Sequence, residues 1–313
     1  MRWWRLEWLS YYLLLPTLLF AGNELHAQSV RQKELITSGI TQARLGDYKT
    51  ALATLNEAVM LDSTEAEPYY NRGIVKTELK DFKGAISDFS KVITMKPARA
   101  EPYFNRGLAR DLQGDHQGAI MDYRIAIALR PDYADAYHNL GLVRLELAQY
   151  QEAVRDFSRS IQYAPEFHEA YYNRGLSWYY MNDYQRAIED FDEALKLDPL
   201  EAEYYDSRGS AKAGLGLFQE ASADFQSAHR LNPADTSVMM NLALSYMYLK
   251  EYHQAISMYN KVIVISPGSA EALTQRGVAR HYLADNAGAC ADWKLASGGE
   301  SSKARDYLTK YCK

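Results

Sequence analysis

Apolar and polar residues follow the period of an amphipathic helix along most of the chain, and that pattern is itself repeated. From Gln32 onward, the same arrangement of apolar, small and polar residues returns every 34 residues, eight times without insertion or deletion. The tripeptide Asn-Arg-Gly, which begins at Asn71, Asn105 and Asn173, marks the register. A period of this length indicates a stack of similar helical units, each burying its apolar face only against its neighbours.

Each repeat is predicted to be two helices followed by a stop. The repeats span residues 32–65, 66–99, 100–133, 134–167, 168–201, 202–235, 236–269 and 270–303. Proline stands at position 32 of six repeats, where it ends the second helix because it has no amide hydrogen to donate. We therefore expect an all-α chain of helix pairs.

Small residues recur where the two helices of a repeat should meet. Position 8 is glycine in seven repeats, and position 20 is alanine in all eight. A glycine inside a helix costs up to about 1 kcal/mol relative to alanine, so we expect a close approach there, with position 8 facing position 20. Aromatic residues at positions 4 and 24 are expected to fill the core beside this contact.

Glycine at position 8, an aromatic residue at 17, alanine at 20 and proline at 32 together resemble the tetratricopeptide repeat. The resemblance implies a right-handed superhelical solenoid of eight antiparallel helix pairs with a C-terminal capping helix. It also implies that the first helices line a concave groove that holds peptides or partner proteins.

In this family, position 6 of the first helix faces the groove, and in this chain it is asparagine in five repeats. An asparagine offers a donor and an acceptor, so a row of them can pair with the backbone of an extended peptide. The row is similar to the asparagine ladder in the repeat superhelix of O-linked N-acetylglucosamine transferases. The alternative interpretation is a polar residue on a solvated helix face. The row comprises Asn71, Asn105, Asn139, Asn173 and Asn241.

Aromatic and thioether side chains occupy the neighbouring groove positions 5, 9, 12 and 13. Such side chains suit a binding surface, although the alternative is that they complete the core between repeats. We expect a hydrophobic recognition spot at repeats five to seven, where the seventh repeat holds four methionines. The predicted groove residues are Tyr70, Phe104, His138, Tyr172, Tyr179, Tyr180, Met240 and Met247.

Arginine at position 7 and aspartate at position 23 occur together in five repeats and are both absent from the first and seventh. This joint pattern predicts an ion pair between the two helices of a repeat. Only the fourth repeat is mismatched, with Leu140 against Asp156. The predicted pairs are Arg72 with Asp88, Arg106 with Asp122, Arg174 with Asp190, Arg208 with Asp224, and Arg276 with Asp292.

The first 27 residues have the layout of a secretory signal peptide: arginines, a short apolar stretch, then small and polar residues. We expect cleavage after Ala27, leaving a solenoid over residues 28–303. An uncleaved anchor is the alternative, but the apolar stretch from Leu9 to Ala21, which Pro16 interrupts, falls short of the roughly 20 residues that span a bilayer. We expect no membrane span after cleavage.

The C-terminal segment 304–313 has apolar residues at helical spacing and is predicted to be the capping helix. The only two cysteines, Cys290 and Cys312, form a candidate disulfide because export leads to an oxidising compartment. The Tyr-x-Asn-Arg-Gly helices and the Cys-x-Asp-Trp ending resemble periplasmic repeat proteins of the Bacteroidota. The resemblance implies a periplasmic or envelope-associated protein, with a secreted protein as the alternative.

Composition excludes several classes of function. The net charge is −5 and the charges are interleaved, so the sequence has no basic patch for nucleic acid. We find no catalytic motif, no cysteine pair at metal-ligand spacing and no phosphate-binding loop, and we expect no enzyme, metal or cofactor. The hypothesis is an exported, non-catalytic adaptor for a protein or peptide, within an envelope assembly or secretion complex. The alternatives are a periplasmic holding chaperone and a glycan or cell-wall binder.

Overall fold

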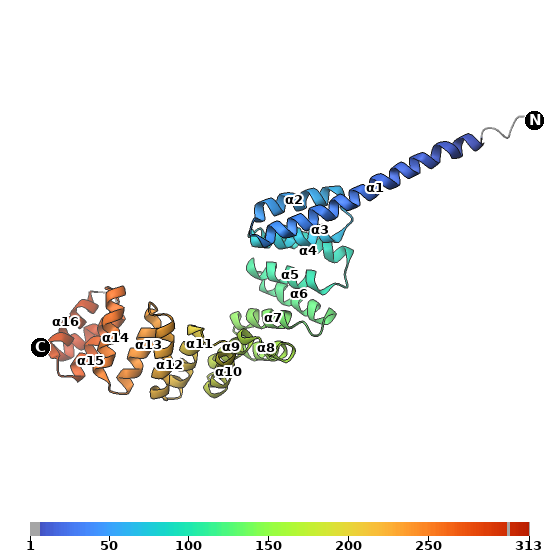
Figure 1. Cartoon of the computed structure of the whole chain (residues 1–313). Coiled ribbons are helices and arrows are strands. Elements are labelled where there is room, and N and C mark those ends of the chain that lie inside the picture. The colour runs from blue at the N-terminus through green and yellow to red at the C-terminus, as the bar shows by residue number, and fades with distance from the viewer. Residues whose placement is uncertain (1–6, 299–300, 313) are drawn as a thin grey trace, which may run out of the picture. The chain divides into compact units, whose positions relative to one another are not determined.

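The computed structural model describes residues 7–298 and 301–312, with side chains from residue 26 onward. Within these ranges every regular element is an α-helix (Figure 1). The described residues form seventeen helices. The predicted all-α fold is confirmed. Residues 1–6 of the predicted signal peptide, residues 299 and 300, and residue 313 of the predicted capping helix lie outside the described residues.

The chain divides into two compact units after Val143, and each is described by itself. The first unit holds α1 (Glu7–Arg44), α2 (Tyr48–Leu61), α3 (Ala66–Glu78), α4 (Phe82–Met95), α5 (Ala100–Leu112), α6 (His116–Leu129) and most of α7 (Ala134–Glu146). The second unit holds α8 (Tyr150–Tyr163), α9 (His168–Tyr180), α10 (Tyr184–Leu197), α11 (Ala202–Gly214), α12 (Phe218–Leu231), α13 (Thr236–Tyr248), α14 (Tyr252–Ile265), α15 (Ala270–Tyr282), α16 (Asn286–Ser297) and α17 (Ser302–Tyr311).

Consecutive helices pack as pairs in both units, α3 with α4 and α9 with α10 for example. From α3 to α15 the first helix of each pair begins at position 1 of a repeat, and every second helix from α2 to α16 begins at position 17. In five repeats an aspartate at position 16 caps the second helix by accepting a hydrogen bond from the backbone N–H three residues on. These caps are Asp47, Asp81, Asp115, Asp183 and Asp285.

The turn between the two helices uses a left-handed residue at position 15 in all eight repeats, with φ between 56° and 88°. Glycine adopts this conformation without strain, whereas a side chain makes it costly. Only three repeats use glycine there, so the residue type did not reveal the position in the sequence. The eight residues are Gly46, Lys80, Gly114, Ala148, Asn182, Gly216, Lys250 and Ala284.

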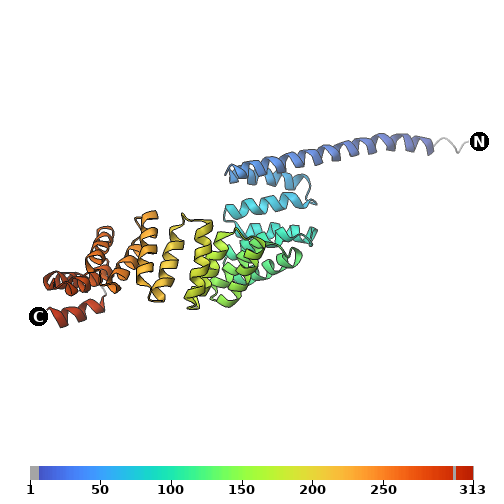
Figure 2. The ribbon, with the colours of Figure 1, turned by 60° about the horizontal axis from the view of Figure 1, so that its bottom comes forward.

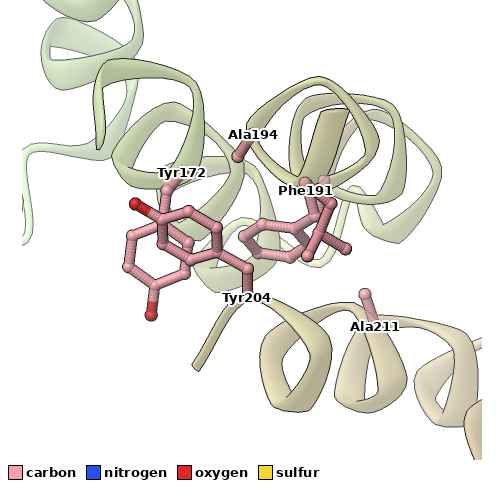
Figure 3. Close-up of a cluster of buried hydrophobic side chains, with 7 residues drawn as sticks. Tyr172, Phe191, Ala194, Tyr204 and Ala211 are labelled. Carbon is pink, nitrogen blue, oxygen red and sulfur yellow. The ribbon is translucent and has the colours of Figure 1, made fainter. Parts of the chain in front are cut away.

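The glycines at position 8 make room for an aromatic ring. A Cβ placed on Gly175 would lie 2.7 Å from the ring of Phe191, at position 24, and 3.3 Å from the backbone oxygen of Ala187, at position 20. The same relation joins Gly73 to Phe89. The predicted approach of alanine to glycine is thus present at Gly175, but the nearest neighbour is the ring at position 24, which was not predicted. Figure 3 shows Phe191 in its cluster, with the stacked rings of Tyr172 and Tyr204 beside it.

The arginine at position 7 and the aspartate at position 23 form the predicted ion pair in all five repeats. Arg174 Nε and Nη2 donate to the two carboxylate oxygens of Asp190, at 2.9 and 2.6 Å. Its third nitrogen, Nη1, donates to Ser158 Oγ of the preceding repeat at 3.0 Å. Equivalent bonds to position 25 of the preceding repeat come from Arg72, Arg106, Arg208 and Arg276. Each arginine therefore links two repeats, which the sequence analysis did not predict.

The fourth repeat is not an exception to charge pairing. Its aspartate, Asp156, accepts a hydrogen bond from Arg144, which stands at position 11 instead of position 7. A basic residue at position 11 also reaches the aspartate in other repeats, as Lys76 reaches Asp88 at 2.8 Å. The apparent mismatch at Leu140 is therefore corrected: the cation has moved by one helical turn.

The first and last elements of the described part are helices. Helix α1 is continuous from Glu7 to Arg44 and passes through Ala27, so cleavage there remains a prediction. No helix in the described part has both the length and the hydropathy to cross a bilayer.

Helix α17 packs on α16 at the C-terminal end (Figure 2), where the rings of Tyr307 and Trp293 lie 5.1 Å apart. The sulfurs of Cys290 and Cys312 lie at disulfide distance, with their Cα atoms 5.8 Å apart.

Candidate functional site

The asparagines at position 6 are held by their own helices. Asn71 Nδ2 donates to the carbonyl oxygen of Glu67 at 2.9 Å, and Asn139 Nδ2 donates to that of Asp135 at 2.8 Å. Asn173 repeats the bond with Glu169 at 2.8 Å. Such a bond uses one of the two amide hydrogens and fixes the orientation of the side chain. In Asn71 and Asn139 it leaves one N–H and Oδ1 for other partners.

Position 6 also bonds to position 5 of the preceding repeat. Asn105 Nδ2 donates to the hydroxyl oxygen of Tyr70 at 2.9 Å. Asn241 Nδ2 donates to Asp206 Oδ1 at 3.1 Å. The hydroxyls of Tyr172 and Ser207 make the same link at 3.2 Å. Positions 5 and 6 form separate lines in the sequence pattern, but their side chains join adjacent repeats, so part of the polar row is structural.

Most of the predicted groove residues at position 5 belong to the core between repeats. Tyr172 and His138 are each only 8% exposed. Tyr70 packs edge-on against Phe89 and carries the guanidinium of Arg99 over its face, 4.4 Å from the ring centre. The surroundings of Tyr70 and His138 therefore fit the core interpretation, whereas Tyr172 is buried and also lines the first of the hollows described below. Phe104 is likewise half-buried, with its ring centre 5.0 Å from that of Tyr133.

The methionines of the seventh repeat also pack inward. Met239 is buried with Ala255 and Tyr259, and Met240 and Met247 lie partly buried against the same cluster. Thioether side chains fill irregular gaps in a core because they are unbranched and flexible. Their placement therefore gives little support to a methionine-rich binding surface.

Two adjoining hollows lie on the face that α9, α11 and α13 build. The first has a volume of about 250 Å³ and the second about 290 Å³, and both are lined by Tyr179 and Ser210. Helix α11 supplies small residues to this face, which leaves space between larger residues of α9 and α13. The first is also lined by Tyr172, Leu176, Tyr180, Glu203, Asp206 and Ser207, and the second by Ala213, Phe218, Phe225, Asn241, Leu244, Ser245 and Tyr248.

Tyrosines at position 13 border the hollows and stack on a ring of the preceding repeat. Tyr180 is 53% exposed and stacks on Tyr150, with ring centres 5.3 Å apart. Tyr248 is 59% exposed and stacks on Phe218 at 4.1 Å. The sixth repeat has Gly214 at this position, against which the ring of Tyr184 lies. The stacking pairs position 17 of one repeat with position 13 of the next. Aromatic residues that recur 30 residues apart are the signal in the sequence that could have revealed these pairs.

Two carboxylates, Glu203 and Asp206, line the first hollow, and Asp206 is the more buried of the two. Burial raises the pKa of this carboxyl above its ordinary value, the bond from Asn241 opposes the rise, and the neighbouring carboxylates of Asp235 and Glu203 add to it. Among the described residues no cation pairs with Asp206, in contrast to the buried aspartates at position 23. Burial also raises the pKa of Tyr179, so this hydroxyl remains neutral at physiological pH.

Helix pairs repeated every 34 residues, with a hollowed face built by first helices, define a helical-repeat scaffold for protein interaction. Models of the tetratricopeptide repeat match residues 66–99, 112–147, 134–167, 168–199 and 237–269. The chain is therefore a tetratricopeptide repeat (TPR) protein, and the resemblance that its sequence pattern indicated is confirmed.

Solved structures agree with this assignment at the level of the fold, whereas no curated protein sequence matches the chain. A TPR protein from Parabacteroides merdae has a TM-score of 0.57 at 20% identity, over 79% of this chain and 99% of that one. The C-terminal part of a TPR protein from Cytophaga hutchinsonii has a TM-score of 0.64 at 17% identity, over 76% and 98%. YrrB, described as a TPR protein with an unusual peptide-binding site, has a TM-score of 0.54 at 24% identity, over 59% and 95%.

Proposed function

We propose that this protein is an exported, non-catalytic TPR scaffold that binds a segment of a partner protein on the face built by α9, α11 and α13. The observation that carries the proposal is the pair of adjoining hollows, which share Tyr179 and have exposed aromatic residues at their edge. Rigid aromatic side chains around a recess are the usual anchors of protein recognition, because they bury a large area at little cost in conformational entropy.

The size of the hollows favours side chains of a partner over a small-molecule ligand. Each, at about 250 and 290 Å³, lies at or below the lower end of the roughly 300 to 1,000 Å³ typical of ligand pockets. Two recesses side by side fit neighbouring side chains of one segment. Leu244, 42% exposed, lies in the second hollow and offers apolar surface to such a segment.

Export and an envelope role complete the proposal and are supported by the sequence. The arginines and apolar stretch before Ala27 have the layout of a signal peptide. The cysteine pair at the C-terminus suits an oxidising compartment. A partner within an envelope assembly or secretion complex is consistent with both features. A holding chaperone is the alternative that a sequence-neutral asparagine row and a methionine-rich surface would suit, but the methionines of repeat seven pack against the core.

Site-specific photocrosslinking in the native host tests the proposal. A crosslinking amino acid at Leu244 lies in the second hollow, and one at Val264, on α14 and 80% exposed, is the matched control. We expect a discrete crosslinked protein from position 244 that is missing from position 264. A broad mixture of proteins at position 244 would support the chaperone instead. Identical patterns at both positions, or glycan without protein, would contradict the scaffold.

A further inference from the structure

We infer that the first hollow receives an arginine or lysine side chain of the bound segment, with Asp206 as its counter-charge. The inference rests on the proposed function, because it specifies which residue of a partner segment enters the groove. It concerns α9 and α11, whose Tyr179, Tyr180 and Asp206 line this recess.

The charge of the hollow is uncompensated within the described part of the chain. Six aspartates at position 23 are buried, and each accepts a hydrogen bond from an arginine. Asp206 is half-buried, but its one hydrogen-bond partner is the neutral amide of Asn241. A carboxylate removed from water without a cation is costly, so a cationic occupant would gain more here than on an open surface.

The walls of the hollow match a basic side chain. The face of a tyrosine ring attracts a cation, and the aliphatic stem of arginine or lysine packs on apolar atoms such as those of Leu176. Tyr179 packs edge-on against Tyr180, with ring centres 5.8 Å apart and planes at 79°. The two rings therefore present differently directed surfaces to a side chain that enters the recess.

The protein already uses this combination of groups internally. Arg208 lies over the ring of Tyr205, 5.6 Å from its centre, and donates to both oxygens of Asp224. Arg174 repeats the arrangement with Tyr171 and Asp190. Each site therefore combines a tyrosine face and an aspartate with an arginine between them. The first hollow offers a tyrosine and an aspartate with about 250 Å³ of space, so the missing group is the cation.

Selection of peptides on the full exported chain tests the inference. A library of random twelve-residue peptides displayed on phage is selected against the wild type, Asp206→Asn and Glu220→Gln. Asp206→Asn keeps an acceptor for Asn241 and removes one negative charge. Glu220→Gln removes the same charge from an exposed residue of α12, outside both hollows. Circular dichroism of each variant establishes that it is folded.

We expect wild type and Glu220→Gln to enrich peptides with an arginine or lysine at a common place. The best of these should bind Asp206→Asn roughly ten- to a hundredfold more weakly, because a hydrogen bond between charged groups is lost. Enriched peptides without a shared basic residue, or equal affinity for Asp206→Asn, would overturn the inference and leave the peptide-binding function standing. Failure of the wild type to enrich any peptide would count against both.

Discussion

Arg174 of α9 holds the carboxylate of Asp190 on α10 with two parallel hydrogen bonds, and no other cation pairs with Asp190 among the described residues. The geometry is that of a bidentate guanidinium and carboxylate, which is stronger than a single bond between neutral groups. In other repeats the aspartate has a second cation at position 11, but here that position is Trp178. The five arginine pairs are therefore not equivalent, and their removal should have unequal effects.

Arg174→Leu should destabilise the protein by about 3 to 5 kcal/mol, because it leaves a buried carboxylate without a counter-charge. Burial already raises the pKa of Asp190, and Arg174 opposes the rise. Since the pKa of the folded state rises further in the variant, its loss of stability should be largest at neutral pH and should shrink at acid pH, where the carboxyl is protonated. Urea unfolding followed by circular dichroism at both pH values measures the effect.

Arg72→Leu is the matched comparison for this prediction. Lys76 still reaches Asp88 at 2.8 Å, so the carboxylate keeps a cation and the loss should be smaller than in Arg174→Leu. Equal losses in the two variants would show that the second cation contributes nothing.

Asp206→Asn should raise the melting temperature at pH 7. The pKa of Asp206 is raised in the folded state, so folding disfavours the ionised form, and this penalty is present at pH values above the folded pKa. Below the unfolded pKa of about 3.9 the carboxyl is protonated in both states, and the difference between variant and wild type should vanish. Thermal unfolding followed by circular dichroism across this pH range is the measurement. A lower melting temperature than that of the wild type at pH 7 would contradict the uncompensated charge.

Ala148→Gly should stabilise the protein by about 0.5 to 1 kcal/mol. Ala148 has a φ of 56°, and relief of that strain is offset in part by the greater chain entropy of glycine in the unfolded state. Gly216→Ala at the same repeat position should have the opposite effect, because nothing lies within 4 Å of its Cβ site and the backbone strain acts alone. Chemical unfolding midpoints of both variants decide the matter, and a shift in the same direction for both would exclude strain as the cause.

Reduction of the protein should destabilise its C-terminal repeat. A bond from Cys290 to Cys312 closes a loop with a sequence separation of 22 residues, which on the loop-entropy model contributes about 3 kcal/mol. Alkylation without reductant, followed by mass spectrometry, should find no free thiol. Two alkylated cysteines would exclude the bond. Hydrogen exchange should show α17 to be the first helix that reduction loosens, because it holds one of the two cysteines.

The sequence predicted those parts of the structure in which residue type follows the repeat. Arg174 and Asp190 were found as a pair because their counterparts appear and disappear together in other repeats. The left-handed residue at position 15 was missed because its identity ranges from Gly46 to Lys250 while its backbone conformation is constant. The contact of Gly175 with Phe191 was missed because the recurrence of small residues does not tell which side chain occupies the space beside the glycine.

The candidate site was less predictable because it depends on departures from the repeat. Tyr179 and Tyr180 were expected on the groove, and both line the first hollow. Asp206 was not expected there, because a carboxylate on a first helix looks ordinary until its lack of a cation is known. Ser210 leaves space in the hollow, and Gly214 lets the ring of Tyr184 approach closely. Neither effect can be predicted from the sequence, because each depends on which residues are neighbours in three dimensions.

The third nitrogen of each position 7 arginine has a mechanical consequence. In the second unit its hydrogen bond links repeat five to repeat four, repeat six to repeat five, and repeat eight to repeat seven. Repeat seven has Leu242 at position 7, so within the described residues this arginine hydrogen bond is missing between repeats six and seven. The second hollow straddles that same junction, with Ser210 on one side and Leu244 on the other. A segment bound in the second hollow would contact both repeats. It would restrict their relative movement at the junction where the arginine bond is missing.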